Sequence, residues 1–344
     1  MSGTSLDGLD VAACEFFFEH GKWSFNILHC HTYPYSSEWT EKLAGLPHVD
    51  ALTFSLVNVE YGHLLGKLTD SFIKSTSFRP QFIASHGHTV FHQPGNRLTV
   101  QIGDGSAIAA ETNLPVICDF RSADLALGGQ GAPLVPVGDR LLFSEYDACL
   151  NLGGFANVSL ESEGKRIAFD ICPANIVLNR LTSKHGMLYD KDGDLARSGY
   201  VDTHLLEKLN NLAYYTLKHP KSLGREWLET NFLPLIINSN GSLEDLLRTI
   251  CDHIAIQVNN SLGNNRSLTV MATGGGTHNL FLMERIRLCG NHQWVIPDQA
   301  WIDFKEALVF AFLGVLRWRR EINVFQSVTG SRSDHSGGAI YYPV

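Results

Sequence analysis

The stretch Ala272-Thr273-Gly274-Gly275-Gly276-Thr277-His278-Asn279 follows the apolar run Leu268–Ala272, so a buried strand enters a glycine loop here. Two further glycine loops read Gly3-Thr4-Ser5-Leu6-Asp7-Gly8 and Leu152-Gly153-Gly154-Phe155-Ala156-Asn157. Glycine tolerates positive φ and lets backbone amides approach an anion, so loops of this kind cradle phosphate oxygens. One such loop is also an ordinary turn. Three, none with a Walker lysine, favour a nucleotide held between two domains.

The composition fits a folded enzyme of two domains. The chain has 344 residues, of which 44% are hydrophobic, and its formal net charge is −8. That length exceeds one typical core, and the acidic balance argues against a nucleic-acid partner. The seven cysteines are scattered without a C-x-x-C pair, which favours a reducing cytoplasm. No apolar segment approaches the ~18 residues of a membrane span, so we expect neither a membrane-spanning helix nor a signal peptide.

Periodicity predicts the main elements of the first half. Two strand-like runs, 11–18 and 23–28, flank His20-Gly21-Lys22 and predict a hairpin. A helix is expected from about Asp50 to Ser75, followed by a short buried strand at 82–84.

The second half repeats this plan. A strand at 146–151 enters the second glycine loop, and 166–169 is its hairpin partner. Apolar residues at helical spacing predict a helix over 243–258, capped by Ser242. Two α/β halves that both open with a strand, a glycine loop and a strand imply a duplicated fold. We expect a first domain at 1–140, a second at 141–324, and a tail at 325–344 that returns to the first.

Met1 lies directly against the first glycine loop, so the strand expected to feed that loop is not in this sequence. We therefore expect a version extended by several apolar residues to have a higher melting temperature.

The chain resembles the family of anhydro-N-acetylmuramic acid kinases over essentially its whole length. The most specific motif is the run 126–136, Ala-Leu-Gly-Gly-Gln-Gly-Ala-Pro-Leu-Val-Pro. The other stretches that carry the resemblance are 1–10, 85–90, 101–104, 119–121, 151–157, 273–279, 305–307 and 328–330.

The resemblance implies an α/β fold of two ribonuclease-H-like (actin-like ATPase) domains that flank a nucleotide cleft and close on ATP. The family opens the 1,6-anhydro ring of anhydro-N-acetylmuramic acid with water and phosphorylates O6. Its product is N-acetylmuramic acid 6-phosphate, formed in cell-wall recycling. A homodimer is expected on the same basis, and the cysteine pattern above predicts a cytoplasmic location. The nucleotide-binding residues that the resemblance implies are Gly3, Thr4, Ser5, Leu6, Asp7, Gly8, Leu9, Asp10, Gly153, Gly154, Asn157, Gly274, Gly275 and Gly276.

The first glycine loop has two compatible interpretations. Asp7-Gly8 is a strong turn dipeptide that closes a hairpin. The Thr4 and Ser5 hydroxyls also suit phosphate oxygens, and Asp7 suits Mg²⁺, directly or through water, because Mg²⁺ prefers oxygen ligands.

Asp170 corresponds to the family's catalytic aspartate. In an ordinary sugar kinase a carboxylate takes the proton of the attacking hydroxyl, but here O6 is an ether oxygen without a proton. The base therefore activates a water that attacks C1, while O6 leaves C1 and receives the phosphoryl group. The alternative is that Asp170 only caps the turn before Pro173.

The sequence departs from the family directly after this aspartate. The usual Thr-Gly-Pro-Gly-Asn is replaced by Ile171-Cys172-Pro173-Ala174-Asn175, so two glycines have gained side chains. We expect a reshaped loop with Asp170 still in place, because a side chain costs energy wherever φ is positive.

Four residues match family positions that bind the sugar: Thr89, Arg121, Asn175 and Glu306. A guanidinium grips a carboxylate bidentately, so Arg121 suits the lactyl group of muramic acid. The alternative for Arg121 is a structural salt bridge with Asp119 or Asp124. The alternative for Glu306 is a capping role, with Asp303 as the N-cap of a helix.

Other functions stay open at this point. One is a different sugar or small-acid kinase of the same superfamily, and another is a non-catalytic ATP-binding regulator. The retained Asp170, Arg121 and Glu306 argue against the regulator. His86, His88 and His92 share strand parity, which is also compatible with a metal site, but Gly87 and Thr89 match the kinase motif better.

Overall fold

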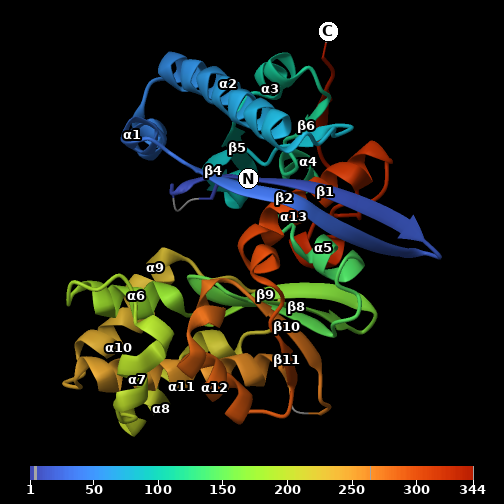
Figure 1. Cartoon of the computed structure of the whole chain (residues 1–344). Coiled ribbons are helices and arrows are strands. Elements are labelled where there is room, and N and C mark those ends of the chain that lie inside the picture. The colour runs from blue at the N-terminus through green and yellow to red at the C-terminus, as the bar shows by residue number, and fades with distance from the viewer. Residues whose placement is uncertain (4–5, 264, 344) are drawn as a thin grey trace. The chain divides into compact units, whose positions relative to one another are not determined.

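The computed structural model describes residues 1–3, 6–263 and 265–343. The chain forms two compact units, one of Met1–Phe143 with Phe304–Val344 and one of Ser144–Asp303 (Figure 1). The chain thus returns to the first unit at Phe304, well before the expected residue 325. The reason is helix α13 (Gln299–Trp318), in which Phe312 packs its ring 5.4 Å from that of Phe16 and 5.0 Å from that of Trp23.

The described residues of the first unit form three small sheets. The hairpin predicted around His20-Gly21-Lys22 is confirmed, and its turn has positive φ at His20 (51°) and Gly21 (77°). The sheets have the strand orders β1-β2, β12-β6-β3 and β4-β5. The strands are β1 (Gly8–Glu19), β2 (Lys22–Pro34), β3 (Ile83–Ala84), β4 (His88–Gln93), β5 (Leu98–Ile102), β6 (Val116–Cys118) and β12 (Ala339–Tyr341).

Helices of the first unit cover these sheets. The long helix predicted after residue 50 is confirmed as α2, capped by the Asp50 carboxylate, which accepts from the backbone N–H of Leu52 at 2.9 Å. Figure 1 shows α2 beside α3, and Gly62 permits this packing because a Cβ there would lie 2.7 Å from the Asp104 carbonyl oxygen. The helices are α1 (Ser37–Gly45), α2 (Ala51–Thr76), α3 (Gly105–Thr112), α4 (Ser122–Ala126), α5 (Pro136–Leu141) and α14 (Gln326–Thr329).

In the second unit, the strands that the structure describes form a five-stranded sheet in the order β11-β10-β7-β8-β9. Strands β7, β8 and β9 are antiparallel neighbours, whereas β10 is parallel to β7 and β11 is parallel to β10. Three antiparallel strands followed by two parallel ones form the sheet of a ribonuclease-H-like domain, as the resemblance implied. The strands are β7 (Ala148–Leu152), β8 (Phe155–Ser162), β9 (Lys165–Pro173), β10 (Thr269–Thr273) and β11 (Gln293–Val295).

Helix α11 forms the centre of the second unit's core. Its predicted N-cap is confirmed, since the Ser242 hydroxyl accepts from the backbone N–H of Asp245 at 3.2 Å. Its buried face includes Leu247, Ile250 and Ile254, all 0% exposed. The helices are α6 (Asn175–Ser183), α7 (Asp194–Ser198), α8 (Thr203–Asn210), α9 (Arg225–Trp227), α10 (Leu233–Ile237), α11 (Leu243–Leu262) and α12 (Leu280–Leu288).

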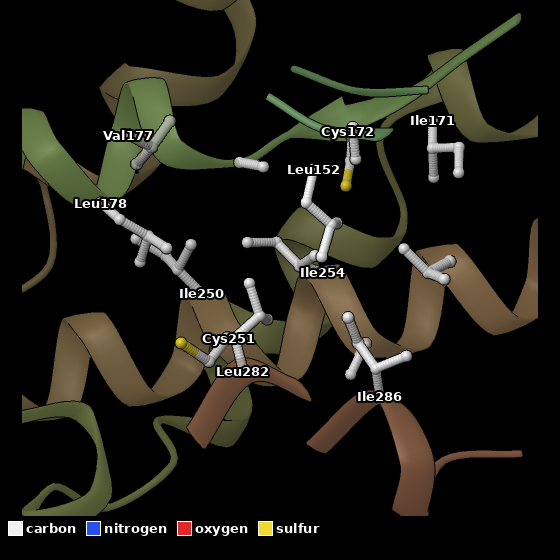
Figure 2. Packing of buried hydrophobic residues seen from close by; sticks show 14 of the residues in the cluster. Leu152, Ile171, Cys172, Val177, Leu178, Ile250, Cys251, Ile254, Leu282 and Ile286 are labelled. Carbon is white, nitrogen blue, oxygen red and sulfur yellow. The ribbon is translucent and has the colours of Figure 1, made fainter. Parts of the chain in front are cut away.

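The residues that replace the family's glycines after Asp170 lie in this core. Cys172 and Ala174 are both 0% exposed, and Figure 2 shows Cys172 beside Leu152. Strand β9 continues through Pro173, and φ at Ala174 is −129°. Cys172 is likewise not among the described residues with positive φ. The two side chains therefore fill core volume without the backbone strain that a positive φ imposes.

Restoring glycine at Cys172 should destabilise the second unit. Cys172→Gly removes a fully buried side chain and adds backbone freedom to the unfolded chain. We therefore expect the free energy of unfolding to fall by about 1–3 kcal/mol. Thermal unfolding should then show a melting temperature lower by ~3–10 °C. The matched control is Cys289→Gly, because Cys289 is exposed and should tolerate the same change. Equal effects at both positions would contradict the packing account.

Candidate active site

Two glycine loops lie at the same edge of the second unit's sheet. Strand β7 pairs in parallel with β10, with Asn151 opposite Thr273, so the loops that follow both strands start side by side. Gly274 has φ of 87°, and a Cβ there would lie 2.4 Å from Asn151 Oδ1. A Cβ on Gly276 would lie 2.8 Å from the Cβ of Leu152. Both glycines are therefore needed for the loops to pack against each other.

Gly275, between them, faces open space. The nearest atom to a Cβ at Gly275 is Asn175 Nδ2, at 4.0 Å. The loop thus presents backbone rather than side chains here, as a cradle for a ligand requires. The carboxyl ends of parallel strands are also where α/β sheets bind their ligands.

Asn175 braces the second glycine loop from the start of α6. Its Nδ2 donates to the Leu152 carbonyl at 2.9 Å, and its backbone N–H donates to the Gly153 carbonyl at 3.2 Å. The backbone N–H of Ala174 donates to the Gly154 carbonyl at 2.8 Å. The structure therefore gives Asn175 a supporting role that the sequence did not reveal.

Asp170 lies on β9 directly opposite Asn157 of β8, so the two side chains share one face of the sheet. Its Oδ2 accepts from the backbone N–H of Leu223 at 2.8 Å, across 53 residues of sequence. The carboxylate therefore accepts a hydrogen bond from a distant segment and does not only cap the turn before Pro173. Burial raises the pKa of the Asp170 carboxyl, and the Leu223 N–H partly opposes that rise.

A segment that the sequence did not single out holds the backbone of Asp170. The Tyr214 hydroxyl donates to the Asp170 carbonyl at 2.6 Å, and the backbone N–H of Asp170 donates to the Lys221 carbonyl at 3.3 Å. The Lys221 ammonium lies 4.6 Å from the centroid of the Tyr214 ring. These contacts fix the position of the aspartate, and no local motif in residues 214–223 indicated them.

In the first unit, Arg121 is held by His86. Burial, together with the charge of Arg121, lowers the pKa of His86 to about 3, so its imidazole is neutral at pH 7. His86 Nδ1 then donates to the Gly87 carbonyl at 3.0 Å, and Nε2 accepts from Arg121 Nε at 3.1 Å. Arg121 Nη1 donates to the Gly131 carbonyl at 2.6 Å. Burial lowers the pKa of the guanidinium to about 10, which leaves it charged at neutral pH.

The alternative of a structural salt bridge for Arg121 does not hold among the described residues. Asp124 is fully buried and accepts from the Gly131 backbone N–H at 2.6 Å and from the Thr329 hydroxyl at 2.7 Å. The Asp119 carboxylate accepts from the backbone N–H of Ser122 at 3.2 Å. The guanidinium of Arg121 thus hydrogen-bonds to neutral groups. The carboxylate of Glu306 raises the pKa of Arg121 through its charge, without a hydrogen bond.

The capping interpretation of Glu306 is wrong. Helix α13 begins at Gln299, so Asp303 lies within it and accepts from Gln299 Nε2 at 2.8 Å. The preceding Lys305 is buried and pairs with Asp139 at 2.8 Å, which fixes the orientation of this helix turn. The Glu306 residue as a whole is accessible to solvent, but nearby protein atoms desolvate its carboxyl group and raise the pKa of that group. The positive charge of Arg121 opposes this rise.

The remaining predicted residues of the first unit are partly described. The Thr89 hydroxyl accepts from Gln101 Nε2 at 3.3 Å on the neighbouring strand. Asp10 Oδ1 accepts from the Thr32 hydroxyl at 2.6 Å, and Leu9 is a core residue with 4% exposure. Thr4 and Ser5 lie outside the described residues.

Among the described residues, no group of three or more His, Cys, Asp or Glu residues could hold a metal ion. Nor is any described helix long and apolar enough to cross a membrane.

Comparison with known proteins identifies the family. The family model described as anhydro-N-acetylmuramic acid kinase matches residues 1–343. The chain belongs to this family. Relatives named anhydro-N-acetylmuramic acid kinase include one from Sulfurovum sp., 33% identical over 99% of this chain and 97% of its own length. One from Vibrio cholerae is 33% identical (100% and 97%), and one from Pasteurella multocida is 34% identical (99% and 95%).

Proposed function

We propose that this chain is an ATP-dependent kinase that opens 1,6-anhydro-N-acetylmuramic acid with water and phosphorylates O6. The product is N-acetylmuramic acid 6-phosphate, recovered in cell-wall recycling. Membership of the family over residues 1–343 supports the reaction class. The main support for the mechanism is the environment of the Asp170 carboxylate: the backbone N–H of Leu223 fixes its position, and burial raises its pKa.

The chemistry balances around Asp170 as general base. Asp170 accepts a proton from a water whose oxygen bonds to C1 of the sugar. The C1–O6 bond breaks, and O6 bonds to the γ-phosphorus of ATP as ADP leaves. A pKa raised towards neutrality makes a carboxylate a better proton acceptor, and a positioned base is typically worth about 10²–10⁴-fold in rate.

The glycine loops are proposed to hold ATP. The space at Gly275 and the exposed backbone beside it fit a nucleotide better than they fit a side chain. In the second unit, the nucleotide would be surrounded by Gly153, Gly154, Asn157, Gly274 and Gly276.

The first loop, from Gly3 to Asp10, would contact the phosphates in the first unit. A single carboxylate such as Asp7 fits the donor set of Mg²⁺, which usually keeps several waters. The ion would neutralise charge on the phosphates.

The sugar is proposed to contact Thr89, Arg121, Asn175 and Glu306. Arg121 suits the lactyl carboxylate, because Gly131 and His86 orient its guanidinium without neutralising its charge. Asn175 retains Oδ1 for a ligand while Nδ2 braces the glycine loop. Cys172 and Ala174 face the core, so the altered sequence after Asp170 does not favour a different substrate.

A cytoplasmic homodimer remains part of the proposal. The cytoplasmic location is supported by seven cysteines that form no disulfide.

Replacing Asp170 by asparagine should remove turnover and keep binding. The amide accepts the Leu223 hydrogen bond but takes no proton, so kcat should fall by about 10²–10⁴-fold while sugar affinity and melting temperature stay near those of the parent. Asp202→Asn is the matched control, because asparagine caps α8 as well as aspartate does. In the parent, turnover should fall as pH drops through the raised pKa of Asp170, above the ~3.9 of an ordinary aspartate. Near-normal turnover of Asp170→Asn would assign the base elsewhere.

Gly275→Val should weaken ATP binding and leave the fold intact. The branched side chain occupies the open space of the cradle, so calorimetry should show at least a ~10-fold loss of ATP affinity, about 1.4 kcal/mol. Gly45→Val is the control, since a Cβ there meets nothing within 4 Å and Gly45 lies outside the cradle. Unchanged ATP affinity in Gly275→Val would place the nucleotide elsewhere.

Arg121→Lys should raise KM for the sugar more than it lowers kcat. Lysine keeps the charge but loses the planar fork that binds a carboxylate bidentately. A charged hydrogen bond is worth about 1.5–3 kcal/mol, so we expect a rise of ~10–100-fold in KM. Arg197→Lys, at an exposed ion pair with Glu284, should leave KM unchanged. A KM at the parent value in Arg121→Lys would exclude the proposed contact.

A further inference from the structure

The glycine loop that follows β10 ends in a histidine, His278, on the open side of the cradle. Residues Gly275–His278 form one turn of 3₁₀ helix, in which positions i and i+3 lie on the same side. Gly275 and His278 are accordingly both exposed, whereas Gly276 and Thr277 between them are buried. With a rise of about 2 Å per residue, the two exposed positions lie ~6 Å apart along the helix axis. The imidazole of His278 therefore lies at the rim of the cradle.

Two side chains from the start of α13, within the second unit, hold this imidazole. Gln299 Nε2 lies 2.8 Å from each carboxylate oxygen of Asp303 and 3.3 Å from His278 Nε2. A carboxylate only accepts hydrogen bonds, so Asp303 turns the NH₂ group of the amide towards itself, and the second N–H donates to His278 Nε2. A neutral imidazole whose Nε2 accepts carries its proton on Nδ1. In the described part of the chain, Nδ1 of His278 has no hydrogen-bond partner.

The rim thus offers one fixed donor, the Nδ1–H of His278, and the acceptor oxygens of Gln299 and Asp303. A phosphate group does not fit this set, because it only accepts hydrogen bonds and the Asp303 carboxylate repels its charge. A pair of hydroxyl groups does fit, since each hydroxyl both donates and accepts. Carboxylates bind ribose hydroxyls in this way at other nucleotide sites. All three side chains belong to exposed residues, which suits polar hydroxyls better than the flat faces of a base.

We propose, on the basis of the proposed ATP-dependent function, that His278, Gln299 and Asp303 form a subsite for the ribose hydroxyls of the nucleotide. The Nδ1–H of His278 donates to one hydroxyl oxygen, and the other hydroxyl donates to a carboxylate oxygen of Asp303. Gln299 fixes the tautomer and the orientation of the imidazole through its hydrogen bond to Nε2. The subsite therefore selects nucleotides by their sugar and is indifferent to their base.

Calorimetry with ATP and with 2′,3′-dideoxy-ATP, in the absence of the sugar substrate, tests this subsite. In the parent, loss of both hydroxyls should weaken binding on the order of 10-fold, the worth of two ordinary hydrogen bonds. His278→Ala should weaken the binding of ATP by ~3–10-fold and leave the affinity for dideoxy-ATP unchanged, because the analogue lacks the hydroxyl that the imidazole binds. His204→Ala, at an exposed histidine of α8, is the matched control and should change neither affinity.

The two nucleotides separate a ribose contact from a purely structural role of the rim. Equal losses of affinity for ATP and dideoxy-ATP in His278→Ala would assign the histidine to the base, the phosphates or the shape of the loop, and would overturn the subsite. Unchanged affinity for ATP in His278→Ala, with Gly275→Val still weakening it, would overturn the subsite alone and leave the cradle in place. A parent chain that binds neither nucleotide would contradict the proposed function and the subsite together.

Discussion

The parallel pairing of β7 with β10 is the constraint on which the second unit's site depends. It places Asn151 beside Thr273, and thereby starts two glycine loops at one edge of the sheet. The loops then pack so closely that Gly274 and Gly276 admit no side chain, while Gly275 between them keeps open space. The same sheet carries Asp170 on β9. The cradle and the proposed base are thus placed by one hydrogen-bonded sheet, and the segment 214–223 adds hydrogen bonds that hold Asp170.

In the first unit, neutral hydrogen-bond partners fix the position of one charged side chain, Arg121. Arg121 is oriented by a neutral His86 and by the Gly131 carbonyl, and the position of Gly131 is set in turn by the buried Asp124. Thr329, far away in sequence, completes the bonding of Asp124. This explains why three separated motifs are needed for one guanidinium. A carboxylate partner at Arg121 would have neutralised the charge that the proposed contact with a substrate carboxylate requires.

Local patterns predicted the elements well, because hairpin turns, caps and apolar periodicity act over a few residues. The hairpin at His20-Gly21, the Asp50 cap and helix α11 were all predictable in this way. The contacts of Asp170 with Leu223 and Tyr214 were not, since no local rule connects residues 53 and 44 positions apart. The capping interpretation of Glu306 failed for a related reason. Asp303 looks like an N-cap, but the helix starts at Gln299. The replaced glycines after Asp170 also looked strained in sequence, whereas Cys172 and Ala174 fill the core.

The central claim is that water attacks C1 and O6 receives the phosphoryl group. Turnover in ¹⁸O-labelled water, quenched rapidly and followed by mass spectrometry of the phosphorylated sugar, tests it most directly. The account predicts one ¹⁸O atom at C1 and none in the phosphoryl group. Label in the phosphoryl group, or an unlabelled sugar, would contradict it.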